Sequence, residues 1–82
     1  MTRPMHEKPM RERLLIVGAS GFGREVFCWA TQIPESQRTW DIAGFLDDRK
    51  NELDGLNINP GIIGGPSDYV FRENDLVVVA LG

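Results

Sequence analysis

The segment that most constrains the fold is "LLIVGASGFGREV", residues 14–26. Four apolar residues lead directly into three glycines spaced G-x-x-G-x-G, and an amphipathic run begins at once after them. An unbroken apolar run is typical of a parallel strand that is covered on both faces. A strand, a glycine turn and a helix in this order predict a βαβ unit.

The rest of the chain extends this unit to an α/β fold with a three-stranded parallel sheet and right-handed βαβ crossovers. The predicted strands cover residues 13–18, 40–46 and 75–81. Residues 56–65 are expected to be irregular or weakly extended, and residues 66–74 to form a short helix capped by Ser67 or Asp68. Two helices are too few to cover both faces of the sheet, so we expect a truncated domain or one that takes cover from another chain.

The helix after the glycine turn is predicted to run from about residue 22 to residue 33, where Pro34 follows and ends it. Its apolar stripe, at positions i, i+4, i+7 and i+11, consists of Phe22, Val26, Trp29 and Ile33. Phe27 lies off this stripe. We expect it to be a partly exposed aromatic residue, with contact to another segment or to a partner chain as the alternative.

Composition excludes several classes of protein. The 82 residues suffice for one domain, and 9 Lys and Arg against 12 Asp and Glu argue against nonspecific binding to nucleic acid. No apolar run approaches the roughly 20 residues of a membrane span. A single cysteine fits a reducing cytoplasm, which is the expected location. Residues 1–12 are polar and predicted to be a disordered leader, in which His6 has no partner for a metal.

The glycine turn is a candidate phosphate site. Gly18 can adopt the positive φ of a tight turn, Gly21 allows a ligand to approach the backbone, and Gly23 allows the helix to pack closely on the strand. The N–H groups at the start of the helix favour an anion, so the backbone of Gly18, Ala19 and Gly23 is the predicted phosphate turn. Ser20 adds a hydroxyl that can cap the helix or bind phosphate. The alternative is that the glycines only form the turn.

Asp47 and Asp48 follow the second predicted strand and therefore lie on the same edge of the sheet as the glycine turn. Carboxylates at this edge accept hydrogen bonds from ribose hydroxyls or from the N–H of a base, although Asp also favours plain polar turns. Arg49 and Lys50 are candidates to neutralise a phosphate or are simply solvated. Gly82 ends the third strand and is expected to face the turn. No catalytic constellation and no metal cluster is found in the sequence.

The segments "LLIVGASGFGREV", "IAGFLDDR", "GIIGG" and "LVVVALG" occur in the same order in the N-terminal domain of bacterial nucleotide-sugar acetyltransferases of the PglD/NeuD type, which the chain resembles from about residue 13 to residue 82. These include UDP-4-amino-sugar N-acetyltransferases and sialic acid O-acetyltransferases. The resemblance implies a Rossmann-like domain that binds a UDP-sugar. A C-terminal left-handed β-helix, absent here, would bind acetyl-CoA, supply the catalytic histidine and form a homotrimer.

The resemblance also implies site residues, while catalysis and cofactor binding are not expected of these 82 residues alone. Contacts to the nucleotide carry over to Ser20, Gly21, Phe22, Asp47, Asp48 and Gly82. Phe22 departs from the family pattern, because several relatives have histidine there, and phenylalanine cannot donate a hydrogen bond. Two alternatives remain: an NAD(P)-binding fragment of an oxidoreductase or epimerase, against which the glycine spacing argues mildly, and an assembly domain without a ligand.

Overall fold

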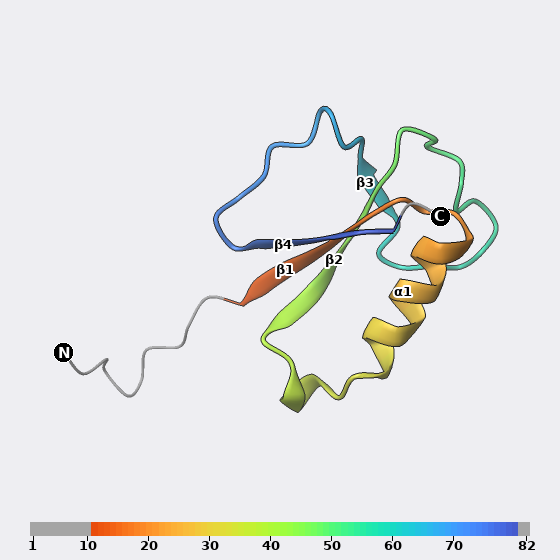
Figure 1. The fold of residues 1–82 in the computed structure, drawn as a ribbon. Coiled ribbons are helices and arrows are strands. Elements are labelled where there is room, and N and C mark those ends of the chain that lie inside the picture. The colour runs from red at the N-terminus through yellow and green to blue at the C-terminus, as the bar shows by residue number, and fades with distance from the viewer. Residues whose placement is uncertain (1–10, 81–82) are drawn as a thin grey trace.

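The computed structural model describes residues 11–80, which form one parallel sheet with a helix on one face (Figure 1). The elements in chain order are β1 (Glu12–Val17), α1 (Gly21–Gln32), a 3-10 turn (Glu35–Gln37), β2 (Trp40–Leu46), β3 (Ile62–Gly64) and β4 (Asp75–Val79). The first ten residues of the expected leader lie outside the described residues, and Glu12 already belongs to β1. None of the helices in residues 11–80 is long and apolar enough to cross a membrane.

The sheet order is β3-β2-β1-β4, and every pair of neighbouring strands is parallel. The predicted α/β class with a parallel sheet is therefore confirmed, with four strands in place of three. The additional strand, β3, arises within the segment that was expected to be irregular. It is held to β2 because the backbone N–H groups of Phe45 and Asp47 donate to the carbonyl oxygens of Gly61 and Gly64, at 3.0 and 2.9 Å.

Helix α1 packs on the sheet with a face that only partly matches the predicted one. Gly23 and Ala30 are buried, and the Phe27 ring lies 5.5 Å from the ring of Phe45 in the core. By contrast, Trp29 is 56% exposed and contacts Phe22 edge to face. The predicted stripe is thus wrong at Phe22 and Trp29, which are exposed, and right at Val26, which packs against the core. Phe27 is partly buried against the same core. The reason is that small residues let the helix backbone approach the strands, so the closest face carries the smallest side chains.

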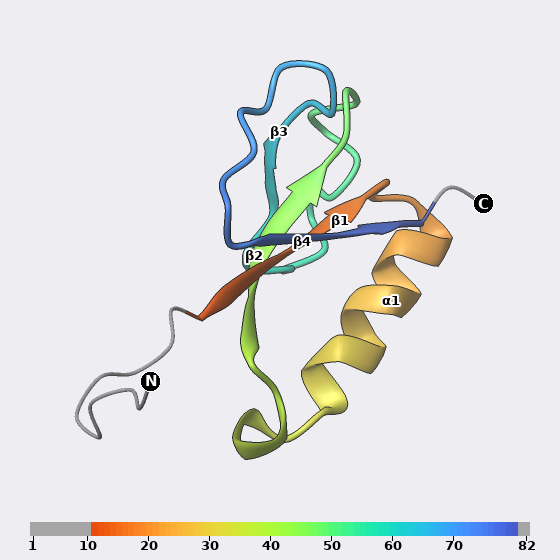
Figure 2. The same ribbon diagram turned by 60° about the vertical axis from the view of Figure 1, so that its left-hand side comes forward.

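The opposite face of the sheet is covered by the crossover from β3 to β4, which Figures 1 and 2 show on the other side of the sheet from α1. The helix predicted at 66–74 does not form in it. A turn occupies residues 66–68, and an extended segment follows in which Tyr69 packs beside Gly64 while Val70 is 82% exposed. The consecutive aromatic and β-branched residues at 69–71 are poor helix formers, and the segment 66–74 is too short to sustain an isolated helix.

Strand β4 lies at the edge of the sheet, and its unbroken apolar run is not covered on both faces. Val77, Val78 and Val79 all remain exposed. The same type of run in β1 is covered as expected, since Leu14, Leu15 and Ile16 are all buried. A continuous apolar run therefore identified the central strand correctly, but it did not distinguish a central strand from an edge strand.

Candidate functional site

The glycine turn joins β1 to α1 at the carboxyl edge of the sheet, and two of its glycines are required by geometry. Gly18 has a φ of 103°, a conformation that other residues rarely adopt, and its N–H donates to the carbonyl oxygen of Leu46 at 2.9 Å. A methyl group on Gly23 would overlap the carbonyl oxygen of Gly18. Gly21 is different, because no atom lies within 4 Å of the position that its side chain would occupy.

The N-terminus of α1 is not capped by a side chain. Ser20 occupies the N-cap position in an extended conformation, but its hydroxyl makes no capping hydrogen bond, and no acidic residue lies in the first turn. The first N–H groups of a helix have no intrahelical acceptor, so they remain donors at this end. Phe22 points away from the core and is 42% exposed. The N–H groups of Gly18 and Ala19 are already bonded to Leu46 and Asp47, so the backbone donors left for a phosphate at this edge are those of the first residues of α1.

Asp47 is buried, and its carboxylate is fully engaged within the protein. Oδ2 accepts hydrogen bonds from the Ala19 N–H at 2.8 Å and from Nη2 of Arg49 at 2.7 Å. Oδ1 accepts from the backbone N–H and from Nε of Arg49, at 2.8 and 3.0 Å. The Arg49 side chain holds the pKa of Asp47 well below its usual range, in spite of the burial, and the two backbone N–H groups add to this effect. Asp47 thus links the end of β2 to the glycine turn.

Asp48 has a different environment from its neighbour. It is exposed and accepts no hydrogen bond from any other residue in the range 11–80. Its carboxylate oxygen Oδ1 lies only 2.5 Å from the position that a side-chain carbon of Gly65 would occupy. The absence of a side chain at Gly65 therefore makes room for Asp48. Of the two predicted carboxylates, Asp48 is the one whose acceptors are open to a ligand.

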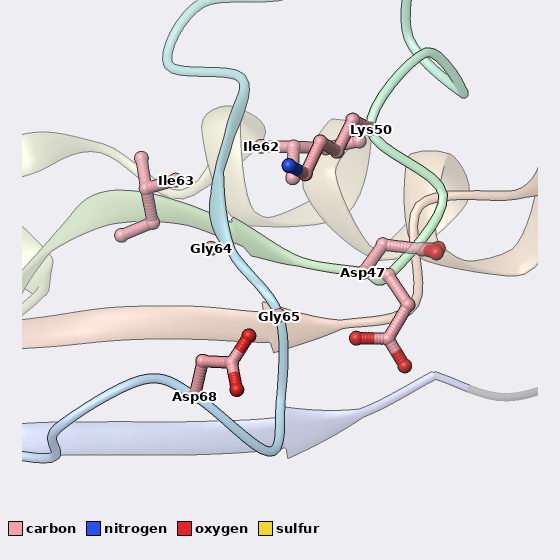
Figure 3. Close-up of a pocket in the computed structure, with 8 residues that line it drawn as sticks. Asp47, Lys50, Ile62, Ile63, Gly64, Gly65 and Asp68 are labelled. Atoms are coloured by element: carbon pink, nitrogen blue, oxygen red, sulfur yellow. The ribbon is translucent and has the colours of Figure 1, made fainter.

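Two cavities meet at Asp47 and Asp48. The first, of about 430 Å³, is lined on its other sides by Lys50, residues 62–65 and Asp68. Figure 3 shows Lys50 and Asp68 at opposite ends of it, with Gly64 and Gly65 between them. The second cavity, of about 500 Å³, is bounded by Gly18 of the glycine turn, Leu46, Arg49 and Pro66. Together they form a continuous rim from Gly18, at the end of β1, to the end of β3.

Comparison with known proteins decides what kind of domain carries this rim. A family model described as the PglD N-terminal domain matches residues 13–82, which is most of the chain. The chain belongs to this family. The resemblance noted from the four sequence segments is thereby confirmed, and the domain stands in the context of an acetyltransferase. No curated protein and no solved structure matched the chain in the same comparisons.

The PglD N-terminal domain described by residues 11–80 brings together only part of the predicted site. Gly18, Asp47 and Asp48 line the cavities, whereas Ser20, Gly21 and Phe22 are not among the lining residues of either one. Gly82 lies outside the described residues, so its place at the rim stays a prediction. Within residues 11–80, no three His, Cys, Asp or Glu side chains are grouped closely enough to hold a metal ion.

Sequence reasoning missed five residues of the first cavity in this PglD N-terminal domain, Ile62 and Ile63 among them. Gly64, Gly65 and Asp68 were not proposed as site residues, although they line it together with Lys50. The available signal was the glycine pair that ends "GIIGG", since paired glycines at a strand end often allow close approach of another group. Assigning this segment as a strand would have placed both glycines at the carboxyl edge, beside the acidic pair.

Proposed function

We propose that this domain binds the nucleotide part of a UDP-sugar and presents the sugar for acetylation. The acetyl group would come from acetyl-CoA and pass to a nucleotide-linked amino sugar or to a sialic acid, through residues beyond this domain in a cytoplasmic homotrimer. The observation that carries the proposal is the position of Asp48, which lines both cavities while one of them is bounded by the glycine turn.

The chemistry of the rim suits the two parts of a nucleoside diphosphate. Carboxylate oxygens accept hydrogen bonds, and a uridine offers donors in its ribose hydroxyls and in the N–H of its base. Asp48 and Asp68 present such acceptors in the first cavity, where Ile62 supplies apolar surface. The diphosphate would lie in the second cavity, which Gly18 of the glycine turn bounds, because the positive end of the α1 dipole close to that turn favours an anion.

An assembly domain without a ligand is the second candidate, and the exposed apolar surface favours it. Phe22 and Trp29 are both exposed on α1, and the three valines of β4 are exposed at the sheet edge. A third reading, an NAD(P)-binding fragment, shares the carboxyl-edge position and the acidic residue of dinucleotide sites. These three readings predict different ligand preferences, so one titration separates them.

Calorimetric titration of the domain with UDP, UDP-N-acetylglucosamine, NAD and CMP is expected to give binding of the two uridine compounds in preference to NAD and CMP. Replacing Asp48 with asparagine should weaken UDP-N-acetylglucosamine binding about tenfold or more, since a hydrogen bond to a charged group contributes roughly 1.5–3 kcal/mol. Asp54→Asn is the matched control, because Asp54 is exposed and lies outside both cavities.

Preference for NAD would contradict the proposal in favour of a dinucleotide site. Binding of none of the four compounds would favour the assembly reading. If D48N and D54N weaken binding equally, the effect is one of net charge, and Asp48 is not a ligand contact.

A further inference from the structure

Arg49 is held in one orientation by the buried carboxylate of Asp47. Its Nε and Nη2 donate to the two different oxygens of that carboxylate, at 3.0 and 2.7 Å. This two-point pairing fixes the plane of the guanidinium as well as its position. The Nη1 nitrogen faces Glu52, at 3.4 Å from its carboxylate. Although the Arg49 side chain is 56% exposed, it is therefore far more restrained than a solvated surface arginine.

The same pairing places Arg49 beside the glycine turn. One oxygen of Asp47, Oδ2, accepts from the Ala19 N–H and from Nη2 of Arg49, so both donors lie within hydrogen-bond distance of a single atom. Arg49 also lines the cavity that Gly18 bounds. The glycine turn is thus joined to the end of β2 through the carboxylate of Asp47, which lies 28 residues after Ala19 in the sequence.

The guanidinium has donors left for a ligand. Arginine carries five N–H groups, and the two that face Asp47 occupy one edge of the planar group. The remaining donors on Nη1 and Nη2 point away from that edge, and the ion pair with Glu52 engages at most one of them. Lys50 offers a useful contrast. It is the next cation in the chain, but it lines the first cavity and not the one beside the turn.

We infer that Arg49 binds the phosphate groups of a nucleoside diphosphate in the cavity beside the glycine turn, and that Asp47 is a positioning residue that holds Arg49 and the turn together. The inference rests on the proposed function and adds to it a residue that recognises phosphate. A guanidinium group that is already oriented loses little conformational freedom on binding an anion, which favours arginine over lysine at such a site. Asp47 contributes through geometry, since its four accepted hydrogen bonds leave it no role as a direct contact.

The test compares uridine with UDP, because the two differ only in the phosphates. In wild type, UDP should bind more tightly than uridine. Arg49→Gln should weaken UDP binding about tenfold or more, because the phosphates lose a hydrogen bond to a charged group. The dissociation constant of uridine should stay within about twofold of the wild-type value, because uridine has no phosphate. Arg72→Gln removes the same charge from an exposed residue outside both cavities and is expected to change UDP binding by less than about threefold, since exposed charges are screened.

Two further variants keep the test decisive. Arg49→Lys retains the positive charge but lacks the planar guanidinium. It should weaken UDP binding, by less than R49Q does, and it replaces R49Q in the test if R49Q does not fold. Asp47→Asn should lower the ratio of uridine to UDP dissociation constants towards one, a readout that a general loss of stability would not change. Circular dichroism confirms that each variant is folded at the titration temperature.

Each outcome discriminates. If R49Q and R72Q weaken UDP binding equally, Arg49 acts only through net charge and the inference is wrong. If R49Q weakens uridine as much as UDP, Arg49 supports the fold and does not bind phosphate. If UDP binding is unaffected by R49Q, the inference fails while the proposed function stands. If wild type binds neither uridine nor UDP, the proposed function itself fails, and the assignment of Arg49 fails with it.

Discussion

Replacing Gly23 with alanine is expected to lower the free energy of unfolding by about 3 kcal/mol, the upper part of the usual range for overpacking. The added methyl group would overlap the carbonyl oxygen of Gly18, which is backbone and cannot rotate out of the way. The start of α1 must therefore move away from β1. For a domain of this size, thermal denaturation followed by circular dichroism should show a midpoint roughly 12–24 °C lower.

The control is Gly21→Ala, two residues earlier in the same helix. No atom lies within 4 Å of the position of the new methyl group, and Gly21 has no positive φ. Alanine is the better helix former by up to about 1 kcal/mol, so G21A is expected to leave the midpoint unchanged or to raise it slightly. A G23A protein as stable as G21A would show that the helix and the first strand do not pack as closely as described.

The second large effect is expected at Asp47. Asp47→Asn removes one of the two carboxylate oxygens as an acceptor and leaves buried donors without a full partner, which should cost about 2 kcal/mol. The corresponding loss in the thermal midpoint is roughly 8–16 °C. Asp48→Asn is the matched control, because Asp48 is exposed and accepts no hydrogen bond within residues 11–80, so its substitution should stay within about 0.5 kcal/mol of wild type.

The pH dependence of stability gives an independent check on Asp47. Its pKa is lower in the folded domain than the value of about 3.9 in an unfolded chain. The carboxylate therefore stabilises the fold fully above that pH, and the contribution is lost as the pH falls below it. Urea denaturation at pH 7 and at pH 3 should show a smaller loss on acidification in D47N than in wild type. Equal losses in the two proteins would contradict the proposed role of Asp47 in stability.

Residues whose environment is fixed by local backbone geometry were predictable from the sequence. The spacing of Gly18 and Gly23 between an apolar run and an amphipathic run was sufficient to predict a close strand, turn and helix unit. Because parallel strands end at one edge of the sheet, the position of Asp47 and Asp48 after the second strand also followed. The α/β class and the edge that carries the candidate site therefore came from local pattern and chain connectivity alone.

Features that depend on tertiary packing were not predictable in this way. The close face of α1 is defined by Gly23 and Ala30, whose small size matters only once the distance to the sheet is known. Tyr69 packs beside Gly64, five residues earlier in the chain, a contact that helical or strand periodicity does not predict. Likewise, two adjacent aspartates look equivalent in sequence. They differ because the Asp47 side chain is buried and bonded to Ala19 and Arg49, whereas the Asp48 side chain is exposed.

The contact between Gly65 and Asp48 makes it possible to separate shape from charge at the candidate site. A methyl group on Gly65 would come within 2.5 Å of Oδ1 of Asp48, which is the mobile end of an exposed side chain and can swing aside. Gly65→Ala would thus redirect an acceptor without removing it and without altering the net charge of the domain. In affinity measurements, G65A reports on the direction of the carboxylate, and D48N reports on its charge. The missing side chain at Gly65, directly after β3, in this way sets the direction of the Asp48 carboxylate, which lies just beyond the end of β2.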